Sequence, residues 1–206
     1  MMKVAVLAAL AGSAAAFAPS PVSQTSRTTL GAYDCSKEIG AQPPLGFFDP
    51  LGLVADVDKD EFDRLRFVEL KHGRVAMLAV VGYLVTYAGI RFPGAEDIPC
   101  GFAAWDEMPL YIYPQMAATV LLMEAANTDQ WEWGQNKSLT GSSPAEFRGD
   151  FRNGALDFGW DKLTPEAKTK KRAVELNNGR AAMMGILGLM VHEKLGNIDL
   201  ILPGGN

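Results

Sequence analysis

Two copies of one charged motif decide the fold: Glu69-Leu-Lys-His-Gly-Arg74 and Glu175-Leu-Asn-Asn-Gly-Arg180. An uncharged apolar stretch follows each copy, and the two segments align at an offset of 106 residues, with Glu, Leu, Gly, Arg, Ala and Met in common. Duplicated helices are a frequent architecture among membrane proteins. The repeat therefore predicts two equivalent helices in one bundle.

The spacing within each motif predicts how the two helices meet. Glu69 and Arg74 are five positions apart, so on a helix they point about 140° away from each other and cannot pair well. If the two helices cross with a two-fold relation, Glu69 meets Arg180 and Glu175 meets Arg74, which neutralises charges that are costly in lipid. The alternative is four separate charges whose side chains extend to the membrane surface. Small residues, which allow a close crossing, occupy the expected contact: Gly73, Ala76, Gly179 and Ala182.

Three uncharged apolar stretches indicate the membrane spans: residues 75–90, 108–123 and 181–191. The third is short, since a bilayer core needs roughly 20 helical residues, so it spans only if the charged motif before it also enters the membrane. We predict an all-α membrane protein with three transmembrane helices, of which the first and third form a crossed, pseudo-two-fold pair held by Glu–Arg ion pairs. The expected helices are residues about 61–91, 108–128 and 168–195.

The N-terminal residues predict targeting rather than fold. Residues 1–18 combine one lysine, an apolar run and small residues, which is the layout of a signal peptide, and residues 19–30 are rich in Ser and Thr without an acid. The two segments in tandem resemble the bipartite presequence of nuclear-encoded plastid proteins in algae with secondary plastids. We expect residues 1–31 to be removed and residues 32–206 to form a single domain. An ordinary secretion signal followed by a linker is the alternative.

The charges of the connections predict an orientation. Lys and Arg flank the starts of the first and third spans, whereas residues 92–107 carry four acids and no base. Basic flanks face the side from which the chain inserts, which in a thylakoid is the stroma. Ordinary surface charge is the other explanation of this asymmetry.

Polar side chains inside the predicted spans are the candidate ligands. Nitrogen and oxygen donors within a span are usually functional, and the Mg²⁺ of a chlorophyll accepts one axial donor of this kind. For the amides and the second histidine, hydrogen bonding between helices is an alternative role. A di-iron site also uses Glu-x-x-His, but the second motif here has Asn178 in place of histidine. The candidate ligands are Glu69, His72, Gln115, Glu124, Glu175, Asn178 and His192.

These motifs resemble the light-harvesting chlorophyll-binding family, and within it the fucoxanthin–chlorophyll a/c proteins of diatoms and related algae. The doubled motif matches the two crossing helices, and Gly46-Phe-Phe-Asp-Pro-Leu-Gly-Leu53 matches the loop before the first. The resemblance implies the axial chlorophyll ligands named above, with His192 at a position where some members have Gln. It also implies that Asp49 and Asp157 lie in loops that meet carotenoid end groups.

The resemblance implies a physical rather than a catalytic function. A thylakoid antenna would bind chlorophyll a, chlorophyll c and fucoxanthin, with diadinoxanthin as a further candidate, and pass excitation to a photosystem. The expected partners are thylakoid lipids, other antenna subunits in an oligomer and a photosystem core. The sequence has no Ser/His/Asp set, phosphate loop or basic patch of the nucleic-acid type, so we expect neither an enzyme nor a nucleic-acid partner. The alternatives are a photoprotective member of the same family and a pigment-free protein built on duplicated helices.

Overall fold

The computed structural model describes residues 33–126, 146–151 and 159–202. The chain divides into two units, residues 1–32 and 33–206. The expected presequence, residues 1–31, lies outside the described residues, as does Asp157. The account below therefore concerns the second unit.

The described residues form four α-helices rather than the three expected, because a short additional helix precedes the middle one. The long helices are α2 (Lys59–Tyr87), α4 (Ile112–Ala126) and α5 (Pro165–Lys194), and the short one is α3 (Ala104–Glu107). Four 3-10 helices complete the elements: η2 (Cys35–Lys37), η3 (Gly101–Ala103), η4 (Trp160–Lys162) and η5 (Ile198–Leu200).

Local signals explain the ends of α2. The side chain of Asp58 accepts a hydrogen bond from the backbone N–H of Glu61 at 2.8 Å, which caps the helix two residues before its expected start. The helix ends at Tyr87, four residues short of the expected Arg91. Gly89 adopts a φ of +79°, a left-handed conformation that terminates helices and favours glycine.

α5 begins three residues before its expected start for a similar reason. The side chain of Thr164 accepts a hydrogen bond from the backbone N–H of Ala167, and Pro165 occupies the first turn, where its missing N–H costs nothing. The helix ends at Lys194, and Gly196 follows with a φ of +69°. Both repeat helices thus start at a capping side chain and end before a left-handed glycine.

α4 begins at Ile112, four residues later than expected. Pro109 disfavours a helical conformation for the residue before it, and Met108 is accordingly extended, with ψ of 128°. The helix starts after a turn in which the Ile112 N–H donates to the Pro109 carbonyl at 2.9 Å. The apolar run 108–123 is therefore not one continuous helix.

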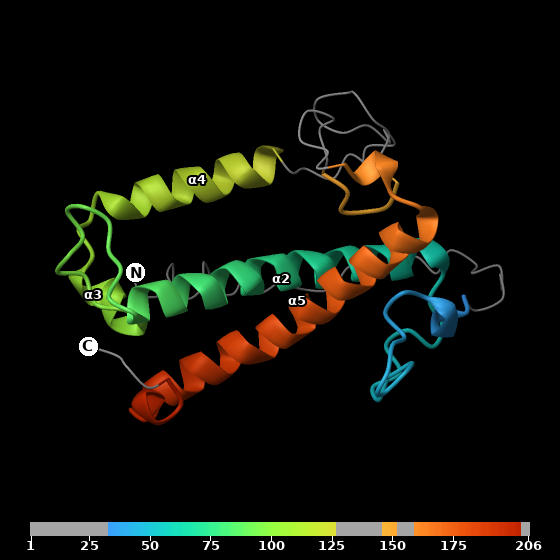
Figure 1. Ribbon diagram of the computed structural model, residues 1–206, viewed down its shortest axis with the longest axis horizontal. Helices are drawn as coiled ribbons and strands as arrows, with labels where there is room; N and C mark the ends of the chain where they lie inside the picture. Colours follow the sequence, from blue (N-terminus) through green and yellow to red (C-terminus); the bar gives the residue numbers. More distant parts are fainter. Residues whose placement is uncertain (1–32, 127–145, 152–158, 203–206) are drawn as a thin grey trace, which may run out of the picture. The chain divides into compact units, whose positions relative to one another are not determined.

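α2 and α5 cross, as Figure 1 shows, and their backbones touch near the middle of each helix. A Cβ placed on Gly73 would lie 2.9 Å from the Cα of Gly179, and one on Gly179 would lie 3.0 Å from the Cα of Gly73. Leu70 and Leu176, which occupy equivalent positions of the repeat, are buried beside this contact. At the crossing the two helices thus meet backbone to backbone.

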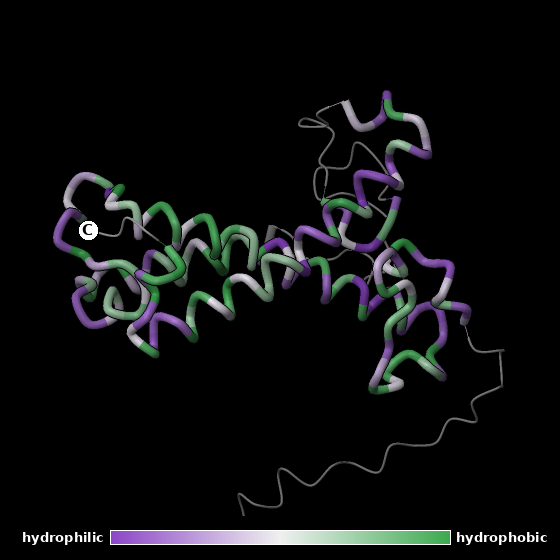
Figure 2. Tube along the Cα trace, turned by 60° about the horizontal axis from the view of Figure 1, so that its bottom comes forward, coloured by the Kyte–Doolittle hydropathy of each residue, from purple (hydrophilic) through white to green (hydrophobic). Residues whose placement is uncertain are grey.

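Most large apolar side chains of the described residues lie on the outside of the helices. The buried core of the described residues is small, and its cluster of Cys35, Val57 and Phe62 joins the segment before α2 to the start of that helix. Figure 2 shows hydrophobic residues predominating along the helices beyond the crossing. Among the described residues, no helix combines the length and the apolar character that crossing a membrane requires. Exposed apolar residues of α2 and α5 include Val75, Leu78, Val81, Met184 and Leu187.

Candidate functional site at the helix crossing

Two reciprocal ion pairs join α2 and α5 at their crossing. The Nε of Arg74 lies 2.7 Å from Oε1 of Glu175, and the Nε of Arg180 lies 2.7 Å from Oε1 of Glu69. All four side chains are partly buried. The structure therefore brings together the four charges of the doubled motif, each glutamate with the arginine of the opposite helix.

Each of these arginines also anchors a loop. Nη1 of Arg74 donates to the carbonyl oxygen of Gly149 at 2.8 Å, and Nη1 of Arg180 donates to that of Gly40 at 2.9 Å. Both glycines are buried and precede the helix that carries the arginine's glutamate partner. One guanidinium thus binds a helix and the segment leading into that helix, and the arrangement occurs twice.

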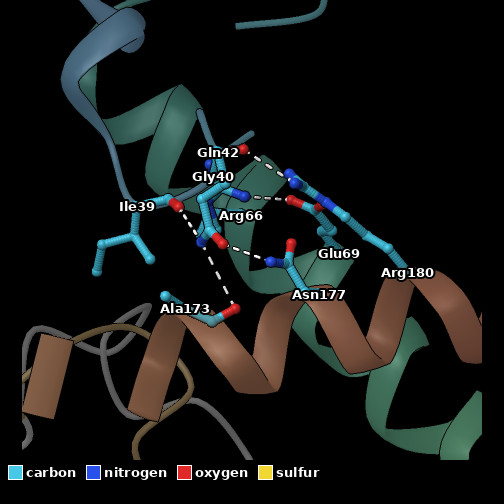
Figure 3. Close-up of polar contacts among 8 residues, drawn as sticks. All are labelled: Ile39, Gly40, Gln42, Arg66, Glu69, Ala173, Asn177 and Arg180. Carbon is cyan, nitrogen blue, oxygen red and sulfur yellow. Dashed lines mark hydrogen bonds and ion pairs between the residues drawn. The ribbon is translucent and has the colours of Figure 1, made fainter. Parts of the chain in front are cut away.

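The pseudo-symmetry fails at one pair of arginines. Arg66 forms a second ion pair with Glu69, one turn along the same helix, so Glu69 binds two guanidinium groups (Figure 3). Arg172 is the equivalent of Arg66 in the repeat, but it stacks on the ring of Phe147, with 4.0 Å between guanidinium carbon and ring centroid. It forms no ion pair with Glu175. The two glutamates therefore have different electrostatic environments.

Gln42 ties the segment before α2 to α5. Figure 3 shows its side chain between the two helices, where its amide nitrogen donates to the carbonyl of Ile39 and, at 3.5 Å, to that of Ala173. Its amide oxygen accepts from the side chain of Asn177. Together with the hydrogen bond from Arg180 to Gly40, these contacts hold the loop beside the Glu69–Arg180 pair.

Both histidines have one ring nitrogen engaged. Nδ1 of His72 lies 2.8 Å from the carbonyl oxygen of Val68, and Nδ1 of His192 lies 3.0 Å from Oδ1 of Asn197. Because carbonyl and amide oxygens only accept, Nδ1 is the donor in both contacts, and in the neutral ring Nε2 is then the nitrogen with the free lone pair. This is the tautomer of a metal-ligating histidine, oriented by its second nitrogen.

The other candidate ligands lie on exposed helix surfaces. Asn178 is exposed on α5, and Gln115 is exposed on α4. The carboxylate of Glu124, also on α4, forms an ion pair with Lys71 of α2. An exposed apolar residue stands four positions before two of the candidates, and so on the same helix face: Val68 before His72 and Val174 before Asn178.

Asp49 has a structural role in the loop before α2. Its two carboxylate oxygens accept from the backbone N–H groups of Leu53 and Val54, each at 3.0 Å. Together with Phe47, Glu69 and Arg180, Asp49 also lines a cavity of about 430 Å³. The loop thus reaches the crossing.

The geometry presents single donors rather than a cluster. In the part of the chain that the structure describes, no group of three His, Cys, Asp or Glu side chains could hold a bare metal ion. Separate single donors of this kind suit the fifth ligand of a metal already held in a flat, apolar macrocycle. The donor set fits the magnesium of a chlorophyll, which accepts imidazole nitrogen and carboxylate or amide oxygen.

Sequence reasoning overlooked three contributors to the site. Arg66 stands three residues before Glu69, a spacing that allows an ion pair on one helix face. This pair could have been predicted from the sequence. The carbonyls of Gly40 and Gly149 had no such signal, because every residue carries one and only the path of the chain selects these two.

Comparison with known proteins identifies the family. The model of the chlorophyll A-B binding protein family matches residues 35–194. Fucoxanthin-chlorophyll a-c binding protein C of Phaeodactylum tricornutum is 54% identical, over 95% of this chain and 97% of its own length. The fucoxanthin-chlorophyll a-c binding protein of Trieres chinensis is 52% identical, over 95% of this chain and 96% of its own length. Fucoxanthin-chlorophyll a-c binding protein B of Macrocystis pyrifera is 44% identical, over 98% of this chain and 95% of its own length. With its paired Glu–Arg crossing and a match over most of its length, the chain belongs to the chlorophyll A-B binding protein family.

Proposed function

We propose that this chain is a light-harvesting antenna protein of the plastid thylakoid membrane that binds chlorophyll a, chlorophyll c and fucoxanthin. The names of the relatives, fucoxanthin-chlorophyll a-c binding proteins described as chloroplastic, support the pigments and the organelle. The family binds pigments and is not a family of enzymes. When bound, the pigments absorb light and pass the excitation on to a photosystem.

The observation that carries the proposal is the pair of half-buried glutamates neutralised by arginines of the opposite helix. In each pair a carboxylate has about four lone-pair sites, so the glutamate can bind its arginine and still present an oxygen to magnesium. The guanidinium removes most of the cost of holding that carboxylate away from water. Glu69 and Glu175 would thus serve the fold and the pigments together.

The remaining ligands are proposed from their chemistry and exposure. His72 and His192 offer an imidazole Nε2, Gln115 and Asn178 an amide oxygen, and Glu124 a carboxylate. For carotenoid end groups we propose Asp49, whose loop borders the cavity at the crossing, and Asp157 by the resemblance. Diadinoxanthin is a further candidate carotenoid.

We further propose that α2, α4 and α5 cross the thylakoid membrane and that residues 1–31 are removed on the way. At 1.5 Å per residue, α2 and α5, with 29 and 30 residues, are each about 44 Å long, and a hydrocarbon core measures about 30 Å. Their exposed apolar side chains would contact lipids, pigments and neighbouring antenna subunits. A photosystem core would receive the excitation.

Purification in a mild detergent, followed by absorption and fluorescence-excitation spectroscopy, tests the proposal. An antenna is expected to retain chlorophyll and to show chlorophyll emission when its carotenoid is excited. A pigment-free protein would contradict it. Bound chlorophyll without carotenoid-sensitised emission would instead contradict the harvesting role while leaving the pigment sites in place.

A further inference from the structure

Arg172 is a half-buried cation for which the described residues supply no hydrogen-bonding partner. Its guanidinium stacks on the face of Phe147, 4.0 Å from the ring centroid, and makes neither a hydrogen bond nor an ion pair with any residue that the structure describes. Stacking engages the face of the guanidinium and leaves the N–H groups at its edge free. A partly desolvated edge of this kind calls for an oxyanion.

Arg172 lines a cavity of about 380 Å³ together with residues of the segment before α2, the start of α2 and α5. The volume admits the acidic end of a larger molecule rather than a whole pigment. Its wall includes Arg66, Leu70 and Leu176, so charged and apolar surfaces meet there. Such a mixed wall suits an amphipathic ligand whose apolar body extends along the helices.

The acids around the cavity already have partners of their own. Asp63 pairs with Lys59 at 3.1 Å, Glu146 with Lys168 at 2.6 Å and Glu175 with Arg74 at 2.7 Å. Glu38 accepts a hydrogen bond from the hydroxyl of Tyr33 and makes no ion pair with Arg172.

The repeat supplies an internal comparison. Arg66, at the equivalent position of α2, uses its guanidinium on Glu69. Arg172 stacks on Phe147 instead, and Glu175 forms its ion pair with Arg74. The sequence offers the same local partner in both helices, three residues on, and only one arginine takes it. The second arginine is therefore available for a ligand.

We propose that Arg172 binds an oxyanion at the end of an amphipathic cofactor, either a pigment carboxylate or the phosphate of a lipid headgroup. The inference rests on the proposed antenna function and adds a specificity determinant to it. Chlorophyll c carries a free carboxylic acid, whereas the acid of chlorophyll a is esterified. A guanidinium in this cavity would therefore select chlorophyll c over chlorophyll a, or an anionic lipid over a neutral one.

The test reconstitutes the full chain with chlorophyll a, chlorophyll c, fucoxanthin and phosphatidylglycerol, and quantifies the bound pigments and lipid by chromatography. Arg172→Gln is expected to lower the affinity for one acidic ligand about tenfold or more, as loss of a charge-assisted contact would, with chlorophyll a retained. Loss of chlorophyll c would identify the pigment as the source, and loss of phosphatidylglycerol the lipid. Lys171→Gln, an exposed neighbour, is the matched control and is expected to bind as the unsubstituted chain does.

Three results would overturn the inference. One is unchanged chlorophyll c and phosphatidylglycerol in Arg172→Gln while the unsubstituted chain holds its pigments, which would leave the antenna function intact. Another is a loss of the acidic ligand in Glu38→Gln as large as that in Arg172→Gln, because Glu38 and Arg172 would then act together as a structural pair. If Arg172→Gln does not fold, the unsubstituted chain provides the third test. It would be reconstituted with chlorophyll c or with the methyl ester of chlorophyll c, each with and without phosphatidylglycerol. Equal binding of the two pigments, unaffected by the lipid, would exclude an oxyanion site.

Discussion

Gly73 and Gly179 face each other so closely that a Cβ on Gly73 would lie 2.9 Å from the Cα of Gly179. The obstacle is backbone rather than a flexible side chain, so neither helix can yield locally. The two ion pairs lie at this contact, and their lengths of 2.7 Å depend on how close the helices approach. The glycines therefore set the spacing of the site.

Gly73→Ala or Gly179→Ala is expected to destabilise the pigmented protein by about 1–3 kcal/mol, because the added methyl group overpacks the crossing. Gly82→Ala and Gly188→Ala are matched controls on the same helices, since nothing in the described structure lies within 4 Å of a Cβ at either position. The measurement is the temperature at which chlorophyll is released. Equal losses at all four positions would refute a special role for the crossing.

Removing Arg74 is expected to harm the protein more than removing Arg180. Arg74→Gln leaves Glu175 without an ion pair, whereas Arg180→Gln leaves Glu69 paired with Arg66. An uncompensated, partly buried charge costs about 1–3 kcal/mol or more. Thermal unfolding of the two single variants, and of Arg66→Gln/Arg180→Gln, checks this order; the double variant should fall to the level of Arg74→Gln.

His192→Leu is expected to remove one chlorophyll per protein, because it deletes the proposed Nε2 donor. Asn197→Ala removes the group that holds the ring through Nδ1 at 3.0 Å, and loss of such an outer partner typically weakens metal binding about 10–100-fold. Pigment stoichiometry from chromatography measures both effects. A full pigment complement in His192→Leu would exclude this residue as a ligand.

Cys35 is expected to resist alkylation in the native protein. The thiol is buried, with 5% of the residue exposed, and this burial raises its pKa, so little of the reactive thiolate forms near neutral pH. Cys100 is less buried and is also a free thiol. Iodoacetamide should therefore modify Cys100 first, and mass spectrometry of the digested protein would show whether Cys35 reacts only after unfolding.

Glu96 is not expected to act as a sensor of mild acid. Hydrogen bonds from its own backbone N–H and from that of Gly94, at 3.0 Å, hold the pKa of its carboxyl below the usual range. A lowered pKa means that its contribution to stability is complete above the ordinary carboxyl pKa and is lost only as the pH falls through the lower value. Between pH 7 and pH 5, Glu96→Gln should therefore leave the fluorescence yield of the pigmented protein unchanged.

Sequence reasoning reached the crossing because a helix allows only certain side chains to meet. The five-residue spacing of Glu69 and Arg74 excluded a pair within one helix and required partners on another, which Arg180 and Glu175 supply in the structure. The predicted start of the middle helix, residue 108, was wrong. Hydropathy identifies an apolar run, but it carries no information on backbone conformation, and Pro109 keeps Met108 extended.

Other features of the site depend on tertiary structure alone. The turn of Arg172 toward Phe147, in contrast to Arg66, follows from where residues 146–151 run, and the local sequence of the two repeats does not distinguish them. The same holds for the proton on Nδ1 of His192, which is fixed by Asn197 beyond the end of the helix. Such contacts join segments whose proximity no periodic pattern encodes.

The reciprocal pairing also constrains the order in which the protein can be made. Arg74 and Glu175 are 101 residues apart in the chain, and Glu69 and Arg180 are 111 apart. During synthesis α2 therefore emerges long before either partner exists. Glu69 can already pair with Arg66 on its own helix, whereas Arg74 has no carboxylate partner until α5 follows. The first half of the chain therefore cannot complete the crossing by itself, and the site forms only when the second repeat helix has been made.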